Sequence, residues 1–92
     1  MGILEQAAEK IIEEQEKIIG PIALEQAKKV PGLSVDLRKH EVKIEGNQKE
    51  ILQKLVEQYQ HLFGQASVEV CKDAVKDIIK RVPPDNVPSL IL

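Results

Sequence analysis

The spacing of the apolar residues changes twice along this 92-residue chain, and this change limits the fold more than any single motif does. From residue 3 to residue 19 apolar residues recur every three or four positions, which is the spacing of one face of an α-helix. Between residues 33 and 45 apolar and polar residues alternate, which is typical of strands with one buried face. Helical spacing returns at residue 48. The sequence therefore predicts an α+β fold that is mainly α-helical.

Glycine and proline mark the expected ends of the first two helices. Gly20 can end a helix at about residues 3–19, because glycine adopts the left-handed cap conformation at little cost. Pro21 suits the first turn of a short second helix at about 21–30, since proline has no amide hydrogen to leave unpaired there. One longer helix that is kinked at Pro21 is the alternative interpretation. The Pro-Gly pair at 31–32 stops the helix in either case.

The second half of the chain predicts two longer helices. Asn47 is a good N-cap for a third helix at about 48–63. Gly64 can end this helix, and the Ser67 side chain can cap a fourth helix at about 67–81. Because the connection between the two helices is so short, we expect them to lie antiparallel.

Residues 33–45 predict a small β-hairpin that turns around Arg38, Lys39 and His40. An isolated hairpin is marginally stable in water, so this one should pack on the helices or pair with a second chain. The length of the chain suits one domain and not two. We expect a single compact domain over residues 1–84 and an apolar C-terminal tail over residues 85–92.

Composition argues against several classes of function. The formal net charge is −2 and no basic block is present, whereas a nucleic-acid-binding domain normally carries a basic stripe. One Phe, one Tyr and no Trp leave few rings to stack on bases. No apolar run approaches the roughly 20 residues of a membrane span. The acidic, amphipathic N-terminus is unlike a secretory signal, so we expect a cytoplasmic protein that binds no nucleic acid.

The single cysteine and the two histidines carry no recognisable catalytic motif. Cys71 falls on the apolar stripe of the fourth helix, where a buried thiol behaves as a small hydrophobic side chain. His61 lies at the margin of the apolar face of the third helix, and His40 lies at the hairpin turn, so both are expected at the surface. The spacings C-x-x-C, H-x-x-x-H and H-E-x-x-H are absent. We therefore expect no catalytic residue, no cofactor and no metal site, and a protein that is not an enzyme.

The tail and the first helix provide the expected contact surface for a protein partner or for a second copy of the chain. The aliphatic residues that end the tail cannot remain exposed without a risk of aggregation. They fold back between the helices, or they dock on a partner, and the sequence does not decide between these alternatives. The predicted contact residues are Ile11, Ile12, Ile18, Ile19, Leu90, Ile91 and Leu92.

A small-molecule sensor or carrier is the alternative class of function. Leu62 and Phe63 continue the apolar stripe of the third helix to its end, and Tyr59 and His61 lie beside this otherwise apolar seam. A ligand cavity would then lie between the last two helices.

Three parts of the sequence resemble known proteins. The segment "VPGLSVDLRKHEVKIEGNQKEILQKL" is similar to the later part of a heavy-metal-associated domain, but the metal-binding C-x-x-C of that family is absent, so no metal site is carried over. The segment "IIGPIALEQA", followed by "LQKLVEQYQHLFG", resembles a "GPIA" helical module at the C-terminal ends of bacterial signalling proteins. The phrase "LFGQASVEVCKDAV" is similar to small uncharacterised cyanobacterial proteins. The latter two resemblances imply a small non-catalytic bacterial regulatory or protein–protein interaction domain. Self-association is expected instead from the apolar tail and the edge of the hairpin.

Overall fold

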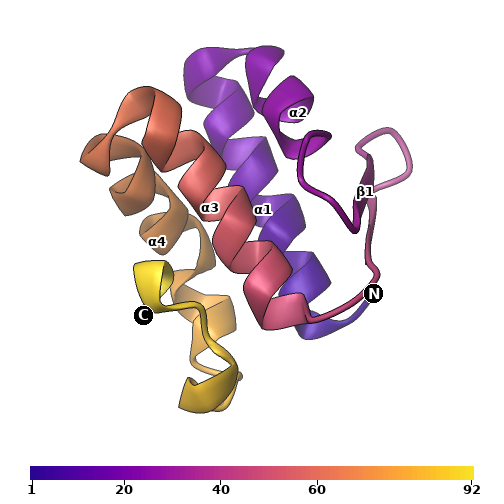
Figure 1. Cartoon of the computed structure of the whole chain (residues 1–92), viewed down its shortest axis with the longest axis vertical. Coiled ribbons are helices and arrows are strands. Elements are labelled where there is room, and N and C mark those ends of the chain that lie inside the picture. Colours follow the sequence, from indigo (N-terminus) through magenta and orange to yellow (C-terminus); the bar gives the residue numbers. More distant parts are fainter.

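The computed structural model covers residues 1–92 and consists of four α-helices, one β-hairpin and two short 3-10 turns (Figure 1). This order of elements confirms the predicted α+β, mainly α-helical class. In chain order the elements are α1 (Ile3–Ile19), α2 (Ile22–Ala27), β1 (Leu33–Asp36), β2 (Glu41–Ile44), α3 (Gln48–Phe63), α4 (Gln65–Ile79), η1 (Pro84–Asn86) and η2 (Ser89–Ile91).

The helices share one hydrophobic core. Helix α1 packs against α4, and α3 packs against both of them (Figure 1). Ile11 and Ile12 of α1, Leu52 and Leu55 of α3 and Val75 of α4 are completely buried in this core. Helices α3 and α4 run in opposite directions, as the short connection between them predicted (Figure 1).

Helices α2 and α4 differ from the sequence prediction at their ends. Helix α2 stops at Ala27 because the amides of Lys29 and Val30 bond to carbonyls three residues back and tighten the chain into turns. Helix α4 begins at Gln65, and the prediction that Ser67 caps it is wrong, since Ser67 lies buried inside its first turn. Gly64, with a φ of +77°, ends α3 and starts α4 by itself, so no further linker residues are needed.

The hairpin packs on helix α1 rather than standing alone. Leu33 pairs with Ile44 and Val35 pairs with Val42, and these residues form the face that turns toward the core. The amide of Ile44 donates a hydrogen bond of 2.8 Å to the Glu5 carboxylate of α1. Of the two arrangements that the sequence left open for the hairpin, packing on the helices is therefore observed.

Gly32 makes the sharp entry into the hairpin possible. Its φ is +86°, which side chains rarely tolerate, and a Cβ at this position would lie 2.6 Å from the backbone oxygen of Glu45. The amide of Glu45 donates a hydrogen bond to the Gly32 carbonyl at 2.8 Å. The two chain segments thus meet too closely for any residue other than glycine.

The C-terminal tail folds back onto α3 and α4. Val87, Pro88 and Ile91 are buried, and turn η2 contacts both helices. The amide of Leu90 donates a hydrogen bond of 3.2 Å to the side-chain oxygen of Gln53 on α3. The structure thereby selects the intramolecular alternative for this segment.

Candidate functional site

The structure buries several of the residues that the sequence placed on a contact surface. Ile11 and Ile12 face the core of the domain, and Ile91 lies beneath the folded tail. These three side chains cannot contact a partner while the domain is folded, because they are already covered by the rest of the chain. They are corrected here to core residues.

The other predicted contact residues retain exposed surface to different degrees. Ile19 and Leu90 are half-buried and pack against the core. Ile18 is 63% exposed near the end of α1, and Leu92 is 69% exposed at the last position of the chain. Only Ile18 and Leu92 therefore present most of their side chains to solvent.

Two further apolar side chains are exposed where α3 turns into α4. Leu62 is 45% exposed and Phe63 is 40% exposed, although helical spacing assigned both to the buried stripe of α3. Every residue from 61 to 66 is exposed, so no other element covers the end of α3 and the start of α4. Periodicity identifies the face of a helix, and it does not show where along that face the packing ends.

Ile18, Leu62 and Phe63 lie at the same end of the molecule, which we call the apolar end. Figure 1 shows both segments in the upper part of the view, with the last turn of α1 at the top and the turn between α3 and α4 at the left. Ile18 also lines a surface hollow with Val70 and Ala74 of α4. The apolar end thus combines residues from the last turns of α1 and α3 beside the start of α4.

A buried glutamine fixes the geometry of this end. The Gln15 side chain interrupts the apolar stripe of α1, yet it is almost completely buried. Its amide donates a hydrogen bond of 3.0 Å to the Ser67 carbonyl and lies 3.4 Å from the Cys71 sulfur. Because a buried amide without partners is costly, these contacts favour one register between α1 and α4.

The only cysteine and the only tyrosine are both core residues. Cys71 is completely buried, and burial raises the pKa of its thiol to about 11, partly offset by the hydrogen bond from Gln15. Tyr59 is also completely buried, and its hydroxyl donates a hydrogen bond of 2.7 Å to the Ala23 carbonyl. Burial raises the pKa of this hydroxyl far above its ordinary value. Both groups stay protonated and covered at neutral pH, as a packing role requires.

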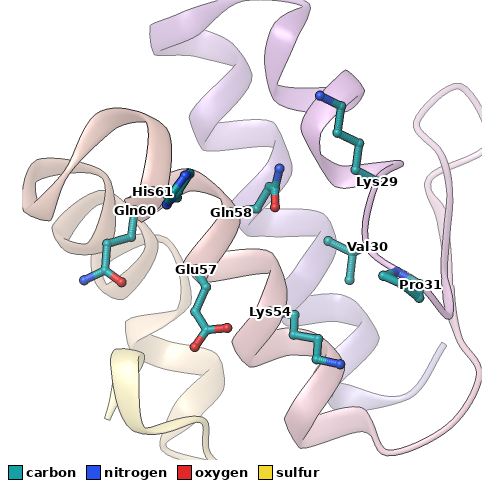
Figure 2. A pocket seen from close by; sticks show the side chains of 8 residues that line it. All are labelled: Lys29, Val30, Pro31, Lys54, Glu57, Gln58, Gln60 and His61. Carbon is teal, nitrogen blue, oxygen red and sulfur yellow. The ribbon is translucent and has the colours of Figure 1, made fainter.

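A polar hollow lies between α3 and the segment that follows α2, and Figure 2 shows its side chains. These side chains fan out in different directions rather than converge on one point, which is what a ligand site normally requires. No surface hollow lies between α3 and α4, where the alternative interpretation expected a cavity. The residues that line the hollow in Figure 2 are Lys29, Val30, Pro31, Lys54, Glu57, Gln58, Gln60 and His61.

One group of side chains has the composition of a metal site. Glu9 and Glu13, one turn apart on α1, face His40 in the hairpin turn, and one ligand atom from each lies within 4.8 Å of the others. The sequence analysis missed this group because His40 is far from both glutamates in the chain. The i, i+4 spacing of the two glutamates was the only signal, and the position of His40 depends on where the hairpin packs.

None of the helices combines the length and the apolar composition that crossing a membrane requires. Comparisons with protein-family models, with curated proteins and with solved structures gave no match. The function therefore has to be argued from the surface and the side-chain groups described above.

Proposed function

We propose that this chain is a small non-catalytic regulatory domain that acts by binding another protein, and that its contact surface is the apolar end. One observation carries the proposal. Apart from Met1 and Leu92 at the first and last positions, the large apolar side chains that are exposed are Ile18, Leu62 and Phe63. A small domain that keeps its exposed apolar residues together at one end has a surface suited to a protein partner.

The chemistry of the apolar end suits a protein contact. Aromatic and aliphatic side chains supply most of the energy at the centre of an interface, and polar residues form the surrounding rim. Phe63 provides the aromatic group, while Ile18 and Leu62 provide aliphatic surface. Covering this apolar surface favours association, although the entropic and desolvation costs of binding keep buried area from converting directly into affinity.

Three further features support a non-catalytic, regulatory role. The Cys71 thiol and the Tyr59 hydroxyl are buried with raised pKa values, so neither is a ready nucleophile or base. The polar hollow beside α3 lacks converging side chains. The resemblance of the "GPIA" segment to modules of bacterial signalling proteins supports a bacterial setting, and we propose that the domain acts in the cytoplasm. The partner is a second copy of the chain or a different protein of that setting.

The proposal is tested with three variants of the full chain. Ile18→Ser and Phe63→Ser each place a hydroxyl at the apolar end, and Leu92→Ser is the matched control because Leu92, at the last position, is more exposed than either. Light scattering over a range of concentrations measures self-association. Affinity capture from a lysate of the native host, read by mass spectrometry, measures binding of other proteins.

We expect Ile18→Ser and Phe63→Ser to weaken association at least about tenfold, since each loses apolar contact worth more than about 1.4 kcal/mol. Leu92→Ser should bind as the unchanged chain does. Equal association by all three variants and the unchanged chain contradicts the assignment of the surface. A monomer at every concentration that also captures no protein contradicts the function itself.

A further inference from the structure

We propose that Glu9, Glu13 and His40 form a binding site for a divalent transition-metal cation of the Zn²⁺ type, which holds the hairpin turn on helix α1. This site is separate from the apolar end and does not depend on the function proposed above. Two carboxylates and one imidazole are ligands that Zn²⁺ commonly takes, with a fourth position left for water or another ligand.

A buried oxygen atom without a partner is the main evidence for a ligand. Glu9 Oε2 has less than 1 Å² of exposed surface and no hydrogen-bond partner. Buried polar atoms in folded proteins nearly always have a partner, because desolvation of an unpaired atom is costly. The one basic group within 4 Å of this atom is the imidazole of His40, whose Nδ1 lies 3.5 Å away and makes no hydrogen bond to it. A cation between the two groups would satisfy both.

Two of the three separations between the ligand atoms are close to those around a tetrahedral ion, and all three atoms lie within 4.8 Å of one another. Bonds of about 2.0–2.1 Å at tetrahedral angles place neighbouring ligand atoms about 3.4 Å apart. His40 Nδ1 lies 3.5 Å from Glu9 Oε2 and 3.8 Å from Glu13 Oε1. The Glu9 side chain is only 16% exposed, whereas the His40 and Glu13 side chains are more exposed and can move toward it to close around an ion.

The distribution of charge around the group leaves the two carboxylates without another cation. Lys17 could pair with Glu13 by its i, i+4 spacing, but its amine lies 3.2 Å from Glu14 instead. Lys10 also pairs with Glu14. His40 is therefore the only basic partner of Glu9 and Glu13, and its Nδ1 provides a third ligand atom beside the two carboxylates. A divalent cation neutralises the two carboxylates and accepts all three lone pairs.

The test is calorimetric titration of the full, untagged, chelator-treated chain with Zn²⁺ at neutral pH. Glu9→Gln removes a ligand charge with little change of shape. His40→Gly removes the imidazole and suits the backbone, because His40 is the one non-glycine residue with a positive φ, +53°. His61→Ala is the matched control, since it removes the other, exposed histidine of the chain.

We expect one Zn²⁺ per chain, a higher melting temperature with the ion bound, and affinity that falls at least about tenfold in Glu9→Gln and in His40→Gly. His61→Ala should bind Zn²⁺ as tightly as the unchanged chain. The proposal is overturned if the unchanged chain binds no Zn²⁺, or if Glu9→Gln and His40→Gly bind it as well as the unchanged chain. An equal loss of affinity in His61→Ala also overturns it, because binding would then not be specific to this group.

Discussion

The Cys71 thiol links the packing of α4 to the stability of the domain at alkaline pH. In the unfolded chain the pKa of this thiol returns to its ordinary value of 9.0, whereas burial in the folded chain raises the pKa to about 11. Since the folded pKa is the higher of the two, the folded state holds the proton more tightly as the pH rises. The stabilisation is complete below pH 9.0 and is lost progressively as the pH rises through about 11.

The expected result is a free energy of unfolding that falls by about 2 kcal/mol more between pH 9 and pH 11 in the unchanged chain than in Cys71→Ala. Chemical denaturation at a series of pH values measures this difference. The comparison uses the slope against pH, because Cys71→Ala also changes packing at every pH. Identical slopes for the two chains would show that the thiol is not buried as described.

The proximity of Glu9, Glu13 and His40 could not be predicted from their positions in the sequence. Each side chain has an ordinary place in the sequence, with the glutamates on the polar face of a helix and the histidine in a turn. They meet because β2 packs beside α1 and brings the turn over the helix. The packing site of the hairpin is a tertiary property, so the spacing of residues along the chain could not predict this group.

At the scale of the elements, the spacing of apolar residues predicted which segments are helical. It could not predict which turns of each helix are covered by other elements. Helices α1 and α3 agree with their predicted ranges, because long apolar stripes and the Asn47 cap mark them clearly. The side chain of Asn47 accepts a hydrogen bond of 3.0 Å from the amide of Glu50. Leu62 and Phe63 continue the stripe of α3 into a part of the molecule where no other element covers them. The residues of the proposed contact surface at the end of α3 thus had the spacing of core residues.

Glu5 is the residue that fixes the hairpin to the first helix. Its carboxylate accepts hydrogen bonds of 2.8 Å from the amides of Gly2 and Ile44, and these bonds lower its pKa. Because the folded pKa is the lower one, the stabilisation is present above the ordinary pKa of 4.5 and is lost as the pH falls through the folded value.

We expect Glu5→Ala to loosen the hairpin and to reduce stability by roughly 1 kcal/mol, a value that allows for solvent screening of this partly exposed carboxylate. Hydrogen exchange of the Ile44 amide, followed by NMR, should become several-fold faster. Glu41→Ala, on the exposed face of β2, is the control and should leave that amide unchanged. Unchanged exchange at Ile44 in Glu5→Ala would mean that other contacts hold the hairpin on α1.

At the scale of the whole molecule, the tail is part of the hydrophobic core and is not a separate segment. Val87, Pro88 and Ile91 fill space over α3 and α4, and Lys49 donates a hydrogen bond of 2.8 Å to the Asp85 carbonyl. The sequence identified these residues as too apolar to remain in solvent, but it could not locate the surface that would receive them. That surface is formed jointly by α3 and α4, and it exists only once these two helices have packed together.

Removal of the tail should therefore destabilise the domain rather than simply remove a binding segment. Fully burying Val87 and Ile91 contributes about 1.5–3 kcal/mol for each side chain, so truncation after Pro84 should reduce the free energy of unfolding by about 3–6 kcal/mol. Since a domain of this kind is stable by about 5–15 kcal/mol, the truncated chain should be partly unfolded on heating to moderate temperature. Urea denaturation of the truncated and full chains measures the difference.

Leu92→Ser, which changes an exposed side chain of the same tail, is the control, and its free energy of unfolding should stay within about 0.5 kcal/mol of that of the full chain. If truncation and Leu92→Ser were equally mild, the tail would contribute little to the core, and its apolar residues would be available to a partner after all.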